Sequence, residues 1–383
     1  MTRDLAAEDD LTMMFDRDRF LADLATFVGF RTVVCQNPDE FRRANDWIRS
    51  FFDPDKTEFQ EFDCHGLSST LIRPRGSRRP RILGDGHIEV VPGDDDLFEL
   101  REVDGILTGR GVADMKTQCL MMIYVLRRLI DEGDHHDFWL LFSEDEEVGS
   151  HYGVSVVADY LAEHDLLPPV VFAPDGGPDF AYVEKEKGIF TFDVTVPGRS
   201  AHASRPYLGE NAIDRMGALY EALKLEYPNP ERESDWRVSL SMTRIEAGEA
   251  SNQIPEGCRA GFDLRLTERE TVDGIRQRLD EIVGEFGAEL LVQQAEPATY
   301  YPKEAPVARP YLELLRRASG REPQILHSAG ASNGRIYVAR DPSIHVLMSS
   351  PAMGSAHSAD ECLVSDSLDA YYELVYETAR MSW

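Results

Sequence analysis

Cysteine is scarce in this 383-residue chain and is not arranged in pairs. The five thiols are scattered, odd in number and never part of a C-x-x-C motif. This distribution argues against a disulfide framework and against a thiolate zinc knuckle, and it favours a reducing cytoplasm. The five positions are Cys35, Cys64, Cys119, Cys258 and Cys362.

The sequence also lacks a long apolar run and an excess of positive charge. No window approaches the roughly 20 consecutive apolar residues of a membrane span. Residues 1–10 are acidic and lack the pattern of a signal peptide. The 40 basic residues are outnumbered by 69 acidic ones, which gives a net charge of -29 and repels nucleic acid and anionic membranes. We therefore expect a cytoplasmic protein that binds neither.

What the chain does contain is the composition of a globular protein, with 42% hydrophobic and 28% charged residues and enough length for about two domains. In the first half, segments with helical spacing alternate with short apolar runs typical of buried strands. This alternation predicts an α/β domain with a mainly parallel sheet and helices on both faces. Helices are expected at 18–28, 41–52 and 116–130, and strands at 69–72, 81–83, 138–142 and 170–173.

From residue 188 the pattern changes, because F-T-F-D-V-T-V alternates apolar and polar residues as a half-exposed strand does. The expected order of elements, β-α-β-β-α-β, predicts an inserted α+β domain with one sheet face covered by helices and the other available for a partner. After residue 302 the pattern returns to a helix at 307–318, a strand at 343–348 and a terminal helix. The predicted boundaries are 1–187, 188–298 and 299–383, with the first and last parts forming one domain.

Five segments place a histidine or a carboxylate after an apolar run or in a glycine-rich turn, where an α/β sheet exposes side chains. Taken singly, each has a plain explanation as a loop residue, a solvated acidic turn or a helix N-cap. Together they favour a metal site, because imidazole and carboxylate suit zinc and its borderline neighbours. The segments are G-D-G-H-I-E-V-V-P at 84–92, G-R-G-V-A-D-M-K at 109–116, S-E-D-E-E-V-G at 143–149, A-P-D-G at 173–176 and S-A-H-S at 355–358.

In this order, the segments resemble those of the dinuclear zinc amidohydrolases, a family that includes aminoacylase, carboxypeptidase G, acetylornithine deacetylase and succinyl-diaminopimelate desuccinylase. The resemblance extends from about His87 to Glu361. It implies a catalytic domain formed by residues 1–187 and 299–383, and a lid and dimerisation domain at 188–298. It also implies a divalent metal cofactor of one or two ions in each subunit, with zinc as the first choice and manganese or cobalt as substitutes.

The resemblance also implies a task for each residue of the metal site. A bridging carboxylate is needed because two cations a few ångströms apart repel each other. A second carboxylate can take a proton from water whose pKa a metal has lowered to about 7. The implied assignments are His87 and Asp175 for one ion, Glu147 and His357 for the other, Asp114 as the bridge and Glu146 as the general base.

The inserted domain carries a further motif, S-A-H-A-S at 200–204, which resembles the lid histidine motif of the family. It implies a homodimer in which His202 reaches the active site of the partner subunit and stabilises the tetrahedral oxyanion. Asn252 and Arg265 resemble the family's binders of a substrate carboxylate, a task that suits the planar fork of arginine. A salt bridge on the strand surface is the plain alternative for Arg265. The expected partner is thus a small substrate that carries a carboxylate.

Two positions depart from the family pattern. Glu89 stands where the family usually has an aspartate that supports the first metal-binding imidazole, and its extra methylene still allows that hydrogen bond. Asn333, within G-A-S-N-G-R at 330–335, stands where an aspartate is common, which changes the charge and the donor pattern near the expected substrate pocket. Both departures bear on the substrate more than on the fold.

Three functions remain open from the sequence. The leading hypothesis is hydrolysis of an amide C–N bond in a small carboxylate-bearing substrate, most simply an N-acyl amino acid or a dipeptide. The same metal site could instead release ammonia from a non-peptide amine, including an aromatic one. The third is a non-catalytic metal-binding relative, against which the retained Glu146 argues, because such a protein does not need the base.

Overall fold

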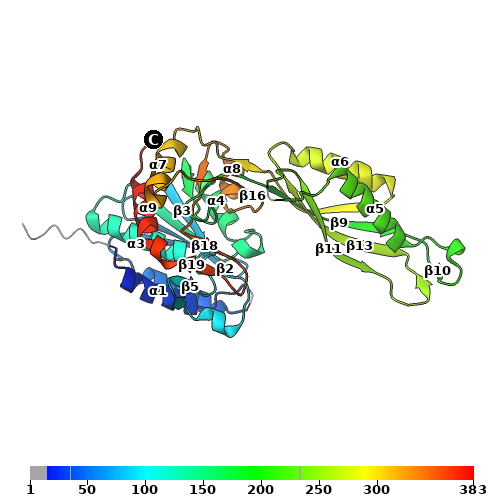
Figure 1. Cartoon of the computed structure of the whole chain (residues 1–383), viewed down its shortest axis with the longest axis horizontal. Helices are drawn as coiled ribbons and strands as arrows, with labels where there is room; N and C mark the ends of the chain where they lie inside the picture. Colours follow the sequence, from blue (N-terminus) through cyan, green and yellow to red (C-terminus); the bar gives the residue numbers. More distant parts are fainter. Residues whose placement is uncertain (1–14, 35, 233) are drawn as a thin grey trace, which may run out of the picture. The chain divides into compact units, whose positions relative to one another are not determined.

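The computed structural model describes residues 15–34, 36–232 and 234–383, so the expectation for residues 1–10 and the thiol of Cys35 lie outside the described residues. The chain forms two compact units. Unit 1 comprises the described residues up to Val183 together with Tyr301–Leu326 and Ser332–Trp383. Unit 2 comprises Glu184–Tyr300 and His327–Ala331 (Figure 1).

Unit 1 is built on a six-stranded mixed sheet, which confirms the predicted α/β class. The strand order is β1-β2-β6-β3-β7-β17. Four neighbouring strands, β6, β3, β7 and β17, pair in parallel, whereas β1 and β2 form an antiparallel hairpin and β2 pairs antiparallel with β6. The sheet is therefore parallel only over the part that supports the candidate site. The strands are β1 (Thr57–Cys64), β2 (Leu67–Pro74), β3 (Ile82–His87), β6 (Phe138–Ser143), β7 (Val170–Phe172) and β17 (His345–Leu347).

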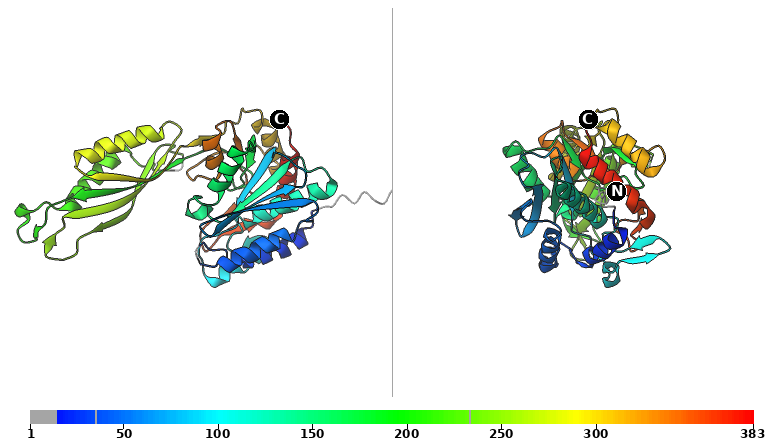
Figure 2. Two further views of the ribbon diagram at one scale, coloured as in Figure 1. Left: turned by 180° about the vertical axis from the view of Figure 1, so that it is seen from behind. Right: turned by 90° about the vertical axis from the view of Figure 1, so that its left-hand side faces the viewer.

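Helices cover both faces of this sheet, as expected, because successive residues of its strands point to opposite sides. Leu140 of β6 packs into a core with α1, α2, α3, α7 and α9, whereas the next residue, Leu141, packs into a second core with α4 and α8. The ribbons of Figures 1 and 2 show helices on both sides of this sheet. Both leucines are fully buried. The helices are α1 (Arg17–Gly29), α2 (Pro38–Arg49), α3 (Lys116–Glu132), α4 (Val154–Glu163), α7 (Ala308–Ser319), α8 (Gly334–Arg340) and α9 (Leu368–Arg380).

A small antiparallel sheet of unit 1 joins segments that are far apart in the sequence. Its strand order is β18-β19-β5-β4, with Cys362 of β19 opposite Thr108 of β5. This pairing brings the segment around His357 to the loop that follows β5. The sequence did not predict this sheet. Its strands are β4 (Arg101–Val103), β5 (Ile106–Thr108), β18 (Met353–Gly354) and β19 (Cys362–Val364).

Unit 2 has the predicted order of elements and a four-stranded antiparallel sheet of order β11-β13-β9-β14. Both of its helices pack on one sheet face, where Phe192 and Phe262 stack with ring centroids 5.0 Å apart. On strand β9, the residue after Phe192 is Asp193, which pairs with Arg259 of the adjacent strand β13 and with Arg244 of β11, the strand beyond it. The elements are β9 (Gly188–Pro197), α5 (Ala212–Glu226), β11 (Ser239–Ala247), β13 (Gly257–Leu266), α6 (Val272–Glu285) and β14 (Glu289–Glu296).

A further three-stranded sheet has the order β15-β8-β16, with β15 (Thr299–Tyr300), β8 (Tyr182–Glu186) and β16 (Ile325–Ser328). The four cysteines in the described residues are free thiols. None of the helices over the described ranges has the length and apolar character needed to span a bilayer.

Candidate metal centre

The parallel strands bring the predicted ligands of unit 1 to one sheet edge. His87 is the last residue of β3 and lies opposite Ser143, the last residue of β6. Asp175 follows the carboxyl end of β7, and the turn Glu146–Val148 follows that of β6. Because the carboxyl ends of parallel strands meet at one edge, these side chains converge there.

Asp114 lies between the two predicted histidine ligands. Its Oδ1 is 3.0 Å from Nε2 of His87, and its Oδ2 is 3.0 Å from Nε2 of His357. The same nitrogen of His357 is 2.9 Å from Oε1 of Glu147. One carboxylate thus has an imidazole on each oxygen, which is the arrangement required of a bridging ligand.

Two overlapping groups of potential ligand atoms result. Ligand atoms of His87, Asp114 and Glu147 lie within 4.8 Å of one another, and so do those of His87, Glu146 and Asp175. The structure thereby brings together five of the six predicted residues in these groups, and His357 joins them through its contacts with Asp114 and Glu147.

The electrostatics of this cluster favour a cation. Burial, together with repulsion from Asp114 and Glu146, raises the pKa of Asp175 well above its usual value. Burial likewise raises the pKa of Glu146 and of Glu147. For Asp114, hydrogen bonds from the two imidazoles outweigh the effect of burial and lower the pKa. Four carboxylates and two imidazoles in one place fit a divalent ion, which would neutralise the crowded negative charge.

His357 adopts a backbone conformation that is uncommon for a residue with a side chain. Its φ is 66°, in the left-handed region. Such a conformation costs about 1–3 kcal/mol and is found where the surroundings require it, often at functional sites. Here it accompanies the contacts of the imidazole with Asp114 and Glu147.

The loop that carries Asp114 is held by Glu361, a residue to which the sequence assigned no role. Glu361 is 1% exposed, and its Oε1 accepts backbone N–H groups of Gly111, Ala113 and Asp114 at 2.9, 3.0 and 3.2 Å. Its Oε2 accepts a hydrogen bond of 2.6 Å from Nη1 of Arg110, which is also buried. The segment that supplies His357 therefore also holds the Asp114 loop in place, through Glu361.

Glu89 does not make the hydrogen bond to the imidazole that its length allows. Nδ1 of His87 lies 3.1 Å from the backbone oxygen of Glu89 and 3.7 Å from its carboxylate, beyond hydrogen-bond length. The carboxylate instead accepts the backbone N–H groups of Glu146 and Glu147.

Asn333 is 3% exposed, and both ends of its amide are engaged within unit 1. Its oxygen accepts a hydrogen bond of 2.7 Å from Ser150, and its nitrogen donates to Asp85 at 3.3 Å. Asp85 also accepts a bond of 2.5 Å from the hydroxyl of Tyr337, and burial raises its pKa to about 7. These contacts favour a role for Asn333 in supporting β3, and its contact with a substrate stays a prediction.

Two buried basic side chains near the site, Lys116 and Arg335, act on different groups. Lys116 donates from Nζ to the backbone oxygens of Phe27 and Phe30, at 3.0 and 2.6 Å, and so holds the end of α1. Arg335, 5% exposed, acts electrostatically on Glu146 and lowers its pKa against the effect of burial. Arg335 is a residue of the site that motif spacing did not assign.

Unit 2 carries the other predicted residues. His202 is exposed, and its Nδ1 accepts the backbone N–H of Ser204 at 3.2 Å. The hydroxyl oxygen of Ser204 also lies 2.8 Å from this nitrogen. With Nδ1 engaged by Ser204, Nε2 is the ring nitrogen that remains to donate a hydrogen bond. The backbone oxygen of Asn252 accepts the N–H of Ala203 at 2.8 Å, so Asn252 lies beside the His202 segment.

Arg265 forms a two-pronged ion pair with Asp263 of the same strand, with N–O distances of 2.7 and 3.0 Å. The salt bridge considered as the plain alternative is therefore present. The side chain of Arg265 is 30% exposed, so part of it stays open to solvent.

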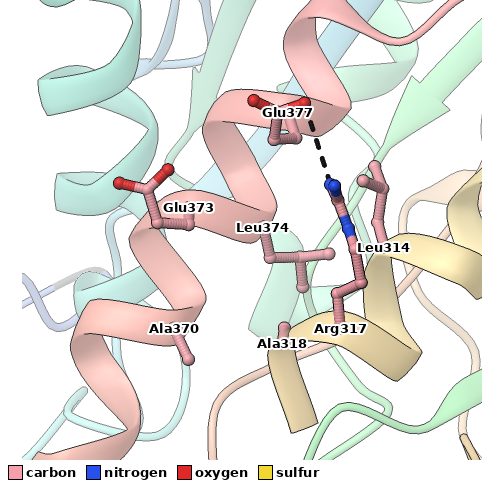
Figure 3. A pocket seen from close by; sticks show the side chains of 7 residues that line it. All are labelled: Leu314, Arg317, Ala318, Ala370, Glu373, Leu374 and Glu377. Carbon is pink, nitrogen blue, oxygen red and sulfur yellow. Dashed lines mark ion pairs between the residues drawn. The ribbon is translucent and has the colours of Figure 1, made fainter. Parts of the chain in front are cut away.

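A groove elsewhere in unit 1, of about 390 Å³, lies between α7 and α9 and contains none of the predicted ligands (Figure 3). An ion pair of 3.8 Å between Arg317 and Glu377 spans it. The lining residues are Leu314, Arg317, Ala318, Ala370, Glu373, Leu374 and Glu377.

An α/β unit that gathers imidazoles and carboxylates in one partly buried cluster at the ends of its parallel strands defines a metal-dependent hydrolase. The chain belongs to peptidase family M20/M25/M40, which matches residues 84–381. It is a metal-dependent hydrolase that acts on carbon–nitrogen bonds.

Individual relatives agree with this assignment. A succinyl-diaminopimelate desuccinylase of Marinobacter nauticus is 26% identical over 325 residues, which cover 82% of this chain and 86% of that protein. Among solved structures, an M20 family metallo-carboxypeptidase from Sulfolobus solfataricus has a TM-score of 0.77 at 15% identity, covering 95% of this chain and 99% of that one. A dinuclear metal-binding M20 peptidase of Bacillus subtilis has a TM-score of 0.62 at 14% identity, with coverage of 96% and 99%.

Proposed function

We propose that the protein hydrolyses the amide bond of a small substrate that carries a carboxylate, most simply an N-acyl amino acid or a dipeptide. The observation that carries this proposal is the position of Asp114 between two imidazoles, with Glu146 and Glu147 beside it. The relatives named as desuccinylases support an acylated substrate.

Two ions, zinc first and manganese or cobalt as substitutes, are the proposed cofactor. His87 and Asp175 would hold one ion, Glu147 and His357 the other, and Asp114 would contact both. A divalent ion in such a site acts as a Lewis acid that polarises a carbonyl oxygen and makes water more acidic. The cluster of buried carboxylates supports this assignment, because it needs positive charge to be stable.

Glu146 is the proposed general base. It would take a proton from the attacking water and pass it to the nitrogen that leaves when the C–N bond breaks. A base that must also return its proton works best with a pKa near the working pH, and burial raises the pKa of Glu146 in that direction. Nearby Arg335 would keep the carboxylate charged before it accepts the proton.

His202 is proposed to stabilise the oxyanion in the site of a partner subunit, and Arg265 and Asn252 to bind the substrate's carboxylate. The contacts of Nδ1 with Ser204 support the first role, because they leave Nε2 of His202 to donate to an oxyanion. The partial exposure of Arg265 supports the second, with Asp263 holding the guanidinium in a fixed orientation.

Release of ammonia from a non-peptide amine is the second candidate. The identity of residue 333 motivates it, because an uncharged amide stands where the family commonly has a carboxylate, and its contacts with Ser150 and Asp85 hold that amide in place. A substrate other than an ordinary acyl amino acid would be consistent with that change.

The experiment compares both candidates on the same preparation. Protein stripped with a chelator and reloaded with zinc, manganese or cobalt is given N-succinyl and N-acetyl amino acids, dipeptides and aromatic amines. Free amino acid and ammonia are measured separately. We expect metal-dependent release of amino acid without ammonia. Ammonia alone would support the second candidate, and full activity of verified metal-free protein would refute the mechanism.

A further inference from the structure

Glu89 joins the two strand ends that carry the proposed catalytic groups. It lies two residues beyond His87 and is fully buried. Its Oε1 accepts the backbone N–H of Glu146 in a short hydrogen bond and that of Glu147 at 3.2 Å. These are the first two N–H groups of the short helical turn Glu146–Val148, which the turn itself cannot satisfy.

The same carboxylate is poorly placed to support the imidazole of His87. The distance from Nδ1 to Oε1 is 3.7 Å, and the ring bonds to the backbone oxygen of Glu89 at 3.1 Å instead. The orientation of the ring therefore depends on the main chain at this position. The side chain is available for a different task.

The backbone around Glu89 is held on both sides. The N–H of Ile88 donates to the oxygen of Ser143 at 2.9 Å and continues the parallel pairing of β3 with β6. On the other side, the hydroxyl of the buried Thr32 donates to the oxygen of Ile88 at 2.6 Å, and the N–H of Val90 donates to the oxygen of Thr32 at 2.9 Å. With its backbone fixed, the length of the side chain at 89 decides what the carboxylate reaches.

We propose that Glu89 is a positioning residue for the Glu146–Val148 turn, on which it acts through the backbone N–H groups of Glu146 and Glu147 and not through His87. An aspartate at 89 would withdraw the carboxylate by about 1.5 Å, the length of one C–C bond. The extra methylene is thus what lets one carboxylate set the direction of the base and of its neighbouring ligand. The catalytic consequence rests on the proposed function, whereas the positioning of the turn does not.

Two substitutions separate this role from support of the imidazole. Glu89→Gln keeps the length of the side chain and one oxygen acceptor, whereas Glu89→Asp keeps the carboxyl group and shortens the side chain. Each full-length variant is studied in the zinc-loaded form by hydrogen exchange of peptides covering residues 143–149 and by kcat and KM, and after chelation by calorimetric zinc titration. Thermal unfolding verifies that both are folded.

For Glu89→Asp we expect exchange in the 143–149 peptides to be about 10-fold faster and kcat to fall roughly 10- to 100-fold, with less change in KM. Glu89→Gln should stay near the wild type in exchange and within about 3-fold in zinc affinity. The proposal is overturned if exchange in the aspartate variant is unchanged. It is also overturned if the glutamine variant loses zinc affinity by the 10- to 100-fold expected of an imidazole support. If the wild-type protein cleaves no amide, the proposed function fails, and the exchange result still decides the role of Glu89.

Discussion

Replacing Glu361 with alanine should lower the free energy of unfolding of unit 1 by about 3–5 kcal/mol. The structure sets this magnitude, because Glu361 and Arg110 are both almost fully buried and form an ion pair of 2.6 Å. Removing the carboxylate leaves a buried guanidinium without its anion and three N–H groups without their acceptor. Arg110 keeps its hydrogen bond to the oxygen of Pro92, at 3.3 Å, so the loss of unfolding free energy should lie toward the lower end of this range.

The assay is urea unfolding of chelated protein followed by tryptophan fluorescence. Unit 2 contains one tryptophan, Trp236, so a Trp236→Phe background restricts the signal to the tryptophans of unit 1. Chelation removes the stabilisation that bound metal would add. Glu61→Ala is the matched control, because Glu61 pairs with Arg49 on the surface of the same unit and is 58% exposed. Its loss should cost less than about 1 kcal/mol.

The double substitution Arg110→Met with Glu361→Leu identifies the cause. Removing both charges should recover much of the loss, because the cost of a broken buried pair is mainly that of the unpaired charge. The recovery should stay incomplete, since the N–H groups of Gly111, Ala113 and Asp114 would still lack an acceptor. If Glu361→Ala lowers the free energy of unfolding no more than Glu61→Ala does, Glu361 does not hold the Asp114 loop in solution.

Further predictions concern the proposed catalytic groups and one buried histidine. Glu146→Gln should retain metal and lose turnover by about 100-fold or more, whereas Glu147→Gln should lose metal affinity; metal analysis with kinetics would reveal exchanged roles as the reverse pattern. Mixed dimers of Glu146→Gln and His202→Ala subunits should regain activity if the histidine acts across the interface, and verified mixed dimers without activity would refute this. Arg265→Lys should raise KM with unchanged metal content. The mutant should also distinguish the carboxylate substrate from its neutral amide analogue less strongly than the wild type does. Burial lowers the pKa of His345 from 6.5 to about 4, so between these pH values only the unfolded chain gains a proton. The contribution of His345 to the free energy of unfolding should be fully present above pH 6.5 and should fall by up to about 3 kcal/mol toward pH 4. In a pH series, the unfolding free energy of His345→Gln should depend less steeply on pH than that of the wild type.

The part of the candidate site that follows directly from strand ends was predictable from the sequence. His87 and Glu146 follow short apolar runs typical of buried strands, and parallel strands end at the same sheet edge. Local pattern was enough, because the runs themselves position the side chains. The same holds for the helices, whose apolar spacing decides which face is buried.

Strands that carry no such pattern were missed. In β1 the two aromatic residues, Phe59 and Phe62, are three positions apart and so do not show the period of a strand. Its partner begins after a two-residue turn, His65-Gly66, in which both φ angles are positive, at 57° and 78°. This is the backbone of a tight hairpin turn, but the cue for it, a glycine after a histidine, is weak. The strands of the small sheet are two or three residues long, too short for any period to be recognised. Only pairing across the chain defines them.

The contacts that hold the ligands in place are beyond the reach of local pattern for the same reason. Glu361 meets Arg110 across 251 positions, and nothing near either residue indicates its partner. Glu89 shows this limit most clearly. The sequence alone showed that Glu89 departs from the family's usual aspartate, and the imidazole of His87 was its nearest expected partner in the chain. The carboxylate instead satisfies two N–H groups more than 50 positions away, because β6 ends beside β3 and leaves those donors within reach. Motif spacing therefore predicts which residues meet at such a site, whereas side-chain length and strand register decide which of them hold the others in position.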